Sequence, residues 1–499
     1  MTNQFAMNGL SDQKPHFVLV PLMAQGHMIP MIDLALLLAK RGVLVSLITT
    51  PFNASRIQTT INHAKECCLP IQFVELPFPG AELGLPDGCE NLDVVPTMDL
   101  MVNFFQAIAL LQKPLELYLK EHVSYPNCII SDFCHPWTNK VASNLQVPRL
   151  IFFSICCFTL LCDHNISKYK VYDDITDENE PFIVPGLTEK IKVTKAQAPG
   201  FFSAPGWEEF AKELREAEMA ADGIVVNSFD GLEALHIESY QNAMGKKVWT
   251  VGPLFFYHKD ASYTATRGDK ATIDANRCLG WLDSMKPKSV VYVSFGSLTH
   301  VKPTQLMEIG LGLEASNQPF VWVIKNIEKS QAVDEWLSEG FEERVSARGL
   351  LIKGWAPQVM ILSHPAVGGF ITHCGWNSTI EGITTGIPMV TWPQFGDQFL
   401  NERLVVDVLN SGVPIGVKEP GMFGDDNRVP FVGRDDVEKA VSMLMDEGKE
   451  GQARKERAKI LGKKAVEAMK EGGSSHANMT HMIEYFSINV EKSMAQVAL

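Results

Sequence analysis

The sequence predicts an α/β protein with two facing, doubly wound parallel-sheet domains of the Rossmann-like type. Short apolar runs of strand length alternate with segments of helical periodicity, and this alternation starts again midway along the chain. A polar, weakly periodic segment separates the two halves. The 499 residues, 46% of them hydrophobic, suffice for two or three domains of roughly 100–200 residues. We therefore expect domains over residues 1–252 and 276–476, joined by a linker over residues 253–275.

The N-terminal half opens with a strand, a turn and a helix. Residues 17–22 form an apolar run, Gly26 and His27 make the expected turn, and residues 29–41 carry apolar side chains at helical spacing. Gly42 suits the end of that helix, because glycine adopts the left-handed conformation at little cost. Further apolar runs predict strands over residues 43–49, 128–131 and 149–153.

The C-terminal half repeats this order. An apolar run over residues 289–294 precedes Phe295-Gly296-Ser297, and a helix is expected from about Thr304. Two doubly wound sheets that face each other bring the carboxyl ends of their strands to one cleft, where ligands bind in this fold class. The remaining predicted elements are strands over residues 320–324, 367–372 and 387–392, a Lys-rich helix over residues 451–470 and a last helix from about residue 477.

Composition excludes several classes of protein. A net charge of -14 argues against nucleic-acid partners, which favour a basic surface. The 10 cysteines form no Cys-x-x-Cys pair, which is typical of reduced thiols in the cytosol. The N-terminus lacks a secretory signal pattern, and the longest apolar stretch, residues 150–162, is too short for a membrane helix. We therefore expect a soluble, cytoplasmic protein without stable membrane insertion.

A candidate anion site lies at residues 373–378, where an apolar strand meets a helix. Free N–H groups and the positive end of the helix dipole meet there, and Gly375 permits close approach to the backbone. Asn377 and Ser378 can cap the helix or donate to phosphate oxygens. Taken alone, this segment favours an ordinary capped helix beside a buried histidine, His373, and only the residues around it reverse that interpretation.

A candidate general base lies in the N-terminal half. His27 follows the first strand and Asp132 ends another, and reactive residues are expected at such strand ends. Imidazole titrates near neutral pH, and a carboxylate on its other ring nitrogen would fix the tautomer. A lone histidine at a helix start is more often structural, so the residues alone leave this pair a hypothesis.

The segment over residues 355–398 contains Trp-Ala-Pro-Gln, His-Cys-Gly-Trp-Asn-Ser, Glu381 and a terminal Asp-Gln. It closely resembles the signature box of the plant secondary-product UDP-glycosyltransferases of family one. The resemblance covers nearly the whole chain, including the Ser-Asp pair at residues 131–132. Residues 50–57 and 249–254 look closest to the branch that acts on triterpenoids, flavonoids and hormones.

The resemblance implies a GT-B-type architecture with a UDP-sugar site in the C-terminal domain. Trp355 would stack on uracil, the Ala356 backbone and Gln358 would fix the base and ribose, and Glu381 would accept from the ribose hydroxyls. Without the family, Trp355 would be a plug in the interdomain crevice and Glu381 a solvated helix charge. The full expected donor set is Ser297, Trp355, Ala356, Gln358, His373, Gly375, Trp376, Asn377, Ser378, Glu381, Asp397 and Gln398.

The resemblance also implies inverting transfer of glucose from UDP-glucose to a hydroxyl of a small apolar acceptor. His27 would be the base, supported by Asp132, and Ser297 would help hold the diphosphate. Asp397 and Gln398 would contact the sugar, since a glutamine at that position resembles glucose-users. The N-terminal domain would bind the acceptor, with a C-terminal helix over about residues 477–499 packing back on it.

No Asp-x-Asp triplet and no clustered ligand spacing occurs in the sequence, so we expect no metal cofactor. Residues 104–111, 152–158 and 201–202 would line an acceptor pocket, although plain core packing explains the first two equally well. Among acceptors, we expect terpenoid or steroid-like compounds and flavonoids first, and phenolic hormones or xenobiotics after them. The alternatives are another UDP-sugar donor, a UDP-sugar epimerase, or a non-catalytic UDP-sugar-binding protein.

Overall fold

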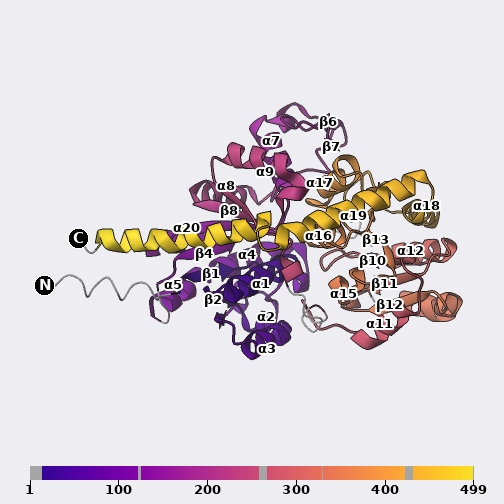
Figure 1. Cartoon of the computed structure of the whole chain (residues 1–499), viewed down its shortest axis with the longest axis horizontal. Coiled ribbons are helices and arrows are strands. Elements are labelled where there is room, and N and C mark those ends of the chain that lie inside the picture. Colours follow the sequence, from indigo (N-terminus) through magenta and orange to yellow (C-terminus); the bar gives the residue numbers. More distant parts are fainter. Residues whose placement is uncertain are drawn as a thin grey trace.

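Two separate parallel sheets organise the molecule (Figure 1). The computed structural model describes residues 14–121, 125–257, 264, 267–328, 330–421 and 431–497. Within these residues the N-terminal sheet has the strand order β3-β2-β1-β4-β5-β8-β9, and the C-terminal sheet has the order β12-β11-β10-β13-β14-β15. All strand pairs in both sheets are parallel. The predicted fold class is confirmed.

The strands are short, and parallel neighbours are joined by crossover connections. The N-terminal sheet consists of β1 (His16–Val20), β2 (Leu44–Thr49), β3 (Ile71–Glu75), β4 (Cys128–Asp132), β5 (Arg149–Phe153), β8 (Gly223–Val226) and β9 (Val248–Thr250). The C-terminal sheet consists of β10 (Val290–Ser294), β11 (Phe320–Ile324), β12 (Gly349–Lys353), β13 (Val367–Thr372), β14 (Met389–Thr391) and β15 (Gly412–Pro414). A separate antiparallel pair is formed by β6 (Pro181–Ile183) and β7 (Lys192–Thr194).

Helices connect these strands and cover the sheets. In the N-terminal half they are α1 (Gln25–Lys40), α2 (Pro51–Arg56), α3 (Gln58–Glu66), α4 (Met101–Ala109), α5 (Gln112–Glu121), α6 (Thr138–Leu145), α7 (Cys157–Lys168), α8 (Glu208–Ala220) and α9 (Asp230–Met244). In the C-terminal half they are α11 (Ala275–Asp283), α12 (Pro303–Ala315), α13 (Gln331–Trp336), α14 (Glu342–Val345), α15 (Gln358–Leu362), α16 (Trp376–Thr384), α17 (Gln398–Arg403), α18 (Arg434–Met445), α19 (Lys449–Met469) and α20 (Ser474–Val497).

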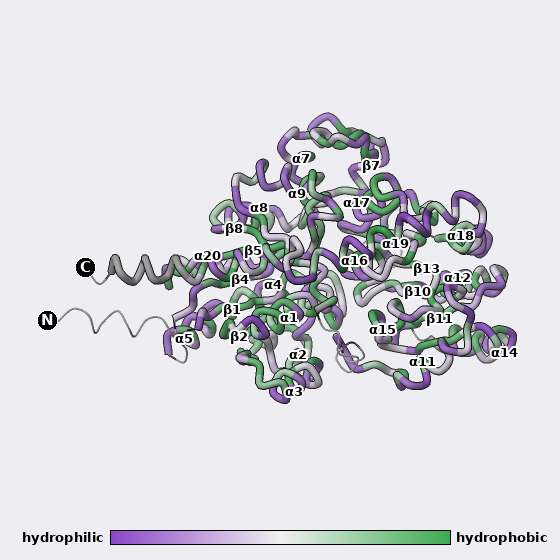
Figure 2. Tube along the Cα trace, viewed as in Figure 1, coloured by the Kyte–Doolittle hydropathy of each residue, from purple (hydrophilic) through white to green (hydrophobic). Residues whose placement is uncertain are grey.

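The central strands are buried along their whole length. Every residue of β1, β4, β5, β10, β11 and β13 is buried. A parallel sheet covered on both faces needs apolar side chains on both, which explains the nearly continuous hydrophobic runs seen along these strands (Figure 2).

The first helix begins earlier than the sequence predicts. α1 starts at Gln25, so Gly26 and His27 lie in its first turn and not in a separate turn. The residue before the helix offers no side-chain cap, so the sequence carries no start signal there. Pro30 lacks the N–H that would bond to the carbonyl of Gly26. That carbonyl instead accepts a hydrogen bond from the Asn377 side chain of the C-terminal half.

The last two helices run across both halves of the molecule (yellow in Figure 1). α19 contacts α9 and α16, and α20 contacts the edge strand β9. Met479, Met482 and Phe486 of α20 are buried in the core of the N-terminal sheet. The Phe486 and Trp249 rings lie 5.7 Å apart, and the Trp249 indole donates a hydrogen bond to His481 at 3.1 Å. The end of the chain therefore covers the far edge of the N-terminal sheet.

Replacing Phe486 with alanine is expected to lower the free energy of unfolding by about 3–5 kcal/mol, because the cavity left by a deleted core ring relaxes only partly. Phe486 is 1% exposed. Chemical denaturation measures the change, and Ile460→Ala on α19, where the side chain is 44% exposed, is the control. Equal losses of stability in the two variants would contradict the packing of α20 on β9.

Several sequence expectations concern residues outside the described set. They include residues 1–13, where no signal pattern was found, linker residues 258–263 and 265–266, and residues 498–499 of the last predicted helix. The domain boundaries at residues 252 and 276 stay predictions. All 10 cysteines are free thiols. Among the described helices, none has both the length and the apolar character needed to cross a bilayer.

Candidate active site

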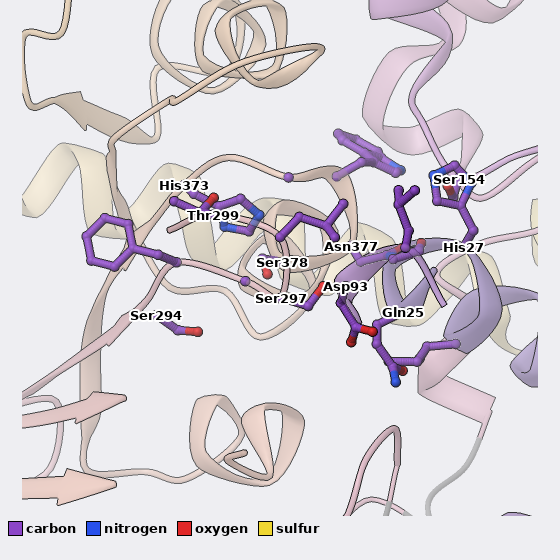
Figure 3. Close-up of a pocket in the computed structure, with 18 of the residues that line it drawn as sticks. Gln25, His27, Asp93, Ser154, Ser294, Ser297, Thr299, His373, Asn377 and Ser378 are labelled. Atoms are coloured by element: carbon purple, nitrogen blue, oxygen red, sulfur yellow. Dashed lines mark hydrogen bonds between the residues drawn. The ribbon is translucent and has the colours of Figure 1, made fainter. Parts of the chain in front are cut away.

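A cavity of about 660 Å³ lies between the carboxyl ends of the two sheets. His27 reaches it from the start of α1, and Ser297 and His373 reach it from the loops after β10 and β13. Figure 3 shows His27 on one side of the cavity and His373 and Ser297 on the other. All of the expected catalytic and donor-binding residues line this cavity except Asp132, which is bonded to His27.

His27 and Asp132 form a hydrogen-bonded pair. His27 Nδ1 lies 2.8 Å from Asp132 Oδ2, and the second carboxylate oxygen accepts the Cys134 N–H at 3.0 Å. Burial alone would lower the pKa of His27, but the charge and hydrogen bond of Asp132 outweigh it and raise the pKa above 6.5. Burial alone would raise the pKa of Asp132, but His27 brings it below its ordinary value. The carboxylate therefore favours the tautomer that leaves Nε2 able to accept a proton.

The raised pKa of His27 sets the expected pH dependence of a reaction in which this ring is the base. The ring works when neutral, so kcat/KM should fall as the pH drops through a pKa above 6.5. In Asp132→Asn the raising charge is gone while burial still lowers the pKa, so this acid limb should move to lower pH. Initial rates between about pH 5 and 9 measure it. An unmoved limb, in a variant whose melting temperature shows that it folds, would contradict the pairing.

Two glycines pack closely against the His373 ring: Gly375, directly before α16, and Gly296, in the loop after β10. A Cβ on Gly375 would lie 2.4 Å from His373 Nε2, and one on Gly296 would lie 2.4 Å from its Cε1. No side chain fits at either position without moving the ring. The backbone N–H groups at the start of α16 thus open onto the cavity beside the imidazole, which is the arrangement that binds anions.

His373 is held as a neutral imidazole. Burial, and then the charge of Lys325, lower the pKa of His373 to about 3. Within the described part of the chain, its buried Nδ1 has no hydrogen-bond partner, and the same is true of Thr299 Oγ1 and Asn377 Oδ1. A neutral ring can donate one N–H to a phosphate oxygen, so His373 offers a directed hydrogen bond without a full positive charge.

One glutamine organises the first turns of α16. Gln358 Nε2 donates to Ser378 Oγ at 3.0 Å and to Glu381 Oε2 at 2.8 Å, and the Tyr292 hydroxyl donates to Gln358 Oε1 at 3.3 Å. Glu381 is only 3% exposed, so it is not the solvated helix charge that was the alternative. Its other oxygen accepts a hydrogen bond from Arg267.

Trp355 lies in the loop after β12 with its side chain at the cavity. Its carbonyl accepts hydrogen bonds from the backbone and side chain of Thr272, at 2.9 and 3.2 Å. A Cβ on Gly268 would lie 2.5 Å from the indole, so the segment between the sheets packs against this ring. The carbonyl of the neighbouring Ala356 accepts the Gln358 N–H at 2.9 Å. The loop is thereby fixed from both sides.

Asp397 and Gln398 begin α17 at the part of the cavity nearest His27. Burial raises the pKa of Asp397 to about 6, and its carboxylate accepts from the Asn401 side chain at 2.7 Å. The charge of Asp397 also raises the pKa of His27, so the two groups interact across the cavity. Gln398 Oε1 accepts the N–H groups of Gln394 and Phe395 at 2.8 and 3.2 Å, which points to its amide N–H groups as the part available to a ligand.

Two residues of α16 bond across to the N-terminal half. The Asn377 side chain donates to the Gly26 carbonyl, directly before His27. The Trp376 indole donates to the Asn227 carbonyl at 2.7 Å, and this ring is 2% exposed. Because the indole N–H is already used, the Trp376 side chain offers an apolar surface and no further hydrogen-bond donor.

The N-terminal part of the cavity is mainly aromatic and aliphatic. Both phenylalanines of the predicted segment 104–111 belong to the hydrophobic core, but only Phe105 also lines the cavity. From residues 152–158 only Ser154 and Ile155 reach the cavity. The rings of Phe201 and Phe202 both line the cavity. The Phe133 ring lies beside them, and the ring centroids of Phe133 and Phe201 are 5.3 Å apart.

Sequence reasoning missed several charged residues at or near the cavity, among them Lys325, Asp33 and Arg267. Lys325 follows β11 directly, which is the same strand-end signal that identified His27, and that signal would have found it. Asp33 lies inside the apolar helix α1 and is fully buried. Arg267 lies in the predicted linker, where no periodicity marks it, and it pairs with both Asp33 and Glu381.

Metal ligands were not expected from the sequence. Among the described residues, no group of three or more His, Cys, Asp or Glu side chains is arranged to hold a metal ion. The expectation of a reaction without a metal cofactor stays a prediction.

Two family models match the chain. Residues 275–427 match the model described as UDP-glucoronosyl and UDP-glucosyl transferase, and residues 15–256 match the glycosyltransferase N-terminal domain. The chain is 47% identical over 473 residues to UDP-glycosyltransferase 73C25 of Barbarea vulgaris, covering 94% of this chain and 96% of the relative. It is also 47% identical over 473 residues to UDP-glycosyltransferase 73C3 of Arabidopsis thaliana, covering 94% and 95%.

Solved structures share the fold over almost the full length. The chain resembles Glycyrrhiza uralensis UGT73P12 complexed with glycyrrhetinic acid 3-O-monoglucuronide, with a TM-score of 0.88, 36% identity and coverage of 97% of this chain and 98% of that one. It also resembles Phytolacca americana UGT2 complexed with UDP-2fluoro-glucose and pterostilbene, with a TM-score of 0.73, 26% identity and coverage of 95% and 100%.

Proposed function

Because this chain belongs to the UDP-glycosyltransferases of the plant family-one type, we propose that it transfers glucose from UDP-glucose to a hydroxyl group of a small apolar acceptor. One observation carries the proposal. His27, which is paired with Asp132, and His373, which lies beside the N-terminus of α16, line a single cavity from opposite sides. A base for the acceptor and a cradle for a diphosphate are the two parts that such a transfer needs.

The C-terminal part of the cavity is assigned to the donor. Uracil stacks on Trp355 beside Ala356 and Gln358, and the ribose hydroxyls donate to Glu381. Asp397 and Gln398 bind the hexose, with the amide N–H groups of Gln398 facing its hydroxyls. The neighbour complexed with UDP-2fluoro-glucose supports a glucose donor. The diphosphate is held by Ser297, His373, Gly375, Asn377 and Ser378, with Trp376 as the wall behind them.

In the proposed reaction, His27 Nε2 takes the proton of the acceptor hydroxyl. The acceptor oxygen then forms a bond to the anomeric carbon on the face opposite UDP, and the bond from that carbon to the β-phosphate oxygen breaks. UDP leaves with the bonding electrons, and the α-linked donor gives a β-glucoside. Asp132 stabilises the imidazolium that forms. The N–H groups of α16 and the neutral His373 stabilise the charge that develops on UDP.

The acceptor is assigned to the aromatic part of the cavity beside His27. Phe105, Phe133, Phe201 and Phe202 provide flat apolar walls there, and Ser154 adds a polar side chain to the cavity lining (Figure 3). Such walls favour a rigid ring system with few polar groups. We therefore place terpenoid or steroid-like and flavonoid aglycones first, which the neighbour complexed with a glycyrrhetinic acid derivative supports, and phenolic hormones second.

A mass-spectrometric assay tests the proposal. Purified protein is incubated with UDP-glucose and a panel of triterpenoids, flavonoids and phenolics, and the expected product has the mass of the acceptor plus one hexose. Parallel reactions with UDP-glucuronate and UDP-xylose measure donor preference. UDP should be released only when an acceptor is present. Conversion of UDP-glucose to another UDP-hexose without acceptor would instead indicate an epimerase.

A further inference from the structure

Arg267 connects two buried carboxylates that belong to different halves of the molecule. Its Nη1 donates to Glu381 Oε1 at 2.5 Å, and its Nη2 and Nε lie 2.8 and 2.9 Å from Asp33 Oδ2. The side chains of Arg267, Asp33 and Glu381 are 10%, 0% and 3% exposed. Charges this deeply buried are stable only when paired and hydrogen-bonded, so this guanidinium is held firmly between the two carboxylates.

The residues after Arg267 are also fixed. Gly268 has φ +87° and packs against the Trp355 indole so closely that a Cβ would lie 2.5 Å from it. Asp269 accepts from the Arg56 guanidinium at 2.8 Å, and Arg56 in turn pairs with Asp93 at 2.7 Å. The segment 267–269 therefore enters the cavity wall at a defined position, beside the residue assigned to uracil.

The hydrogen bonds of Glu381 leave room for a ligand. A carboxylate has about four lone-pair positions. Arg267 takes one on Oε1, and Gln358 Nε2 takes one on Oε2 at 2.8 Å. One position on each oxygen is left, and a cis-diol presents two hydroxyl donors at matching separation. With one donor fixed on each oxygen, the carboxylate plane cannot rotate, so the two remaining positions point in set directions.

We propose that Arg267 is a positioning residue for the donor, which orients the Glu381 carboxylate so that it accepts from both ribose hydroxyls at once. This inference rests on the proposed function, since it takes Glu381 as the ribose ligand. Arg267 itself does not contact the sugar nucleotide in this account. Arg267 therefore affects binding affinity only through Glu381, and only for ligands that carry both ribose hydroxyls.

Binding of UDP and of 2′-deoxy-UDP, measured by titration calorimetry, tests this role. The wild-type protein should bind UDP at least about 10-fold more tightly than 2′-deoxy-UDP, as expected for one hydrogen bond to a charged group. In Arg267→Gln, the affinity for UDP should fall about 10-fold while that for 2′-deoxy-UDP changes less than about 3-fold, so the ratio approaches one. In Arg267→Gln/Glu381→Gln the ratio should equal that of Glu381→Gln alone, because both residues act on the same contact.

Arg56→Gln is the matched control, because it removes a partly buried arginine that ties the same segment to the N-terminal half without touching Glu381. Its ratio of UDP to 2′-deoxy-UDP affinity should equal that of the wild type. Should Arg267→Gln not fold, Arg267→Lys takes its place. A lysine keeps the charge but loses the planar fork, so its ratio should lie between the wild type and one.

Equal losses of affinity for UDP and 2′-deoxy-UDP in the Arg267 variants would overturn the inference and leave Arg267 as a brace between the halves. An unchanged ratio would overturn it as well. Failure of the wild-type protein to bind UDP would instead overturn the proposed function. The two failures are therefore distinguishable in one series of titrations.

Discussion

Replacing His27 with alanine is expected to lower kcat by roughly 10²–10⁴-fold, the usual contribution of a positioned general base. The affinity for UDP should stay close to that of the wild type, because His27 belongs to the N-terminal half and none of the groups assigned to UDP contacts it. Product formation under saturating substrates measures kcat, and calorimetric titration measures UDP binding. Loss of turnover with UDP binding intact would separate a catalyst from a protein that only binds UDP-sugars.

The control for this variant is His63→Ala. His63 lies on α3 and does not line the cavity, so kcat should be unchanged. A His27→Ala protein that keeps wild-type turnover would refute the assignment of His27 as the base. A comparable loss of kcat in both variants would mean that the loss comes from impaired folding.

Replacing Gly375 with alanine should have the second largest effect, through the diphosphate site. The new Cβ would lie 2.4 Å from His373 Nε2, and Gly296 already packs closely against the same Cε1–Nε2 edge of the ring. The imidazole must then leave the position from which it donates. We expect the Kd for UDP to rise about 10–100-fold, the value of one hydrogen bond to a charged group, as measured by calorimetry.

Gly280→Ala is the matched control for Gly375→Ala. Gly280 lies on α11 and a Cβ there meets no atom within 4 Å, so UDP binding should be unchanged and the helix slightly more stable. If Gly375→Ala bound UDP as tightly as the wild type, the cradle at the start of α16 would not be the diphosphate site.

The sequence predicted the central strands well and the edges poorly. β1, β5, β10 and β13 are buried on both faces, so each appears in the sequence as an unbroken apolar run. β3 is an edge strand with exposed Gln72 and Glu75, and β15 is an edge strand that contains Gly412 and Pro414. Neither has the apolar run on which the prediction relied, since an edge strand pairs on one side only.

The candidate site also contains both residues that the sequence identified and residues that it did not. His27 and His373 follow apolar strands, so local sequence placed them at the strand ends where the cavity lies. Arg267 could not be found in this way, because its position depends on its tertiary pairing with Asp33 and Glu381. Contacts made only in the tertiary structure leave no periodic signal in a single sequence.

The route of α19 and α20 has a practical consequence for engineering chimaeras of this enzyme with its relatives. The segment that completes the β9 edge belongs to α20, although Trp249, its partner, lies in the N-terminal half of the sequence. A single crossover between the halves would therefore join each parent's Trp249 to the other parent's closing helix. A graft with two junctions, the second near Gly472, keeps each helix with the sheet it evolved to cover.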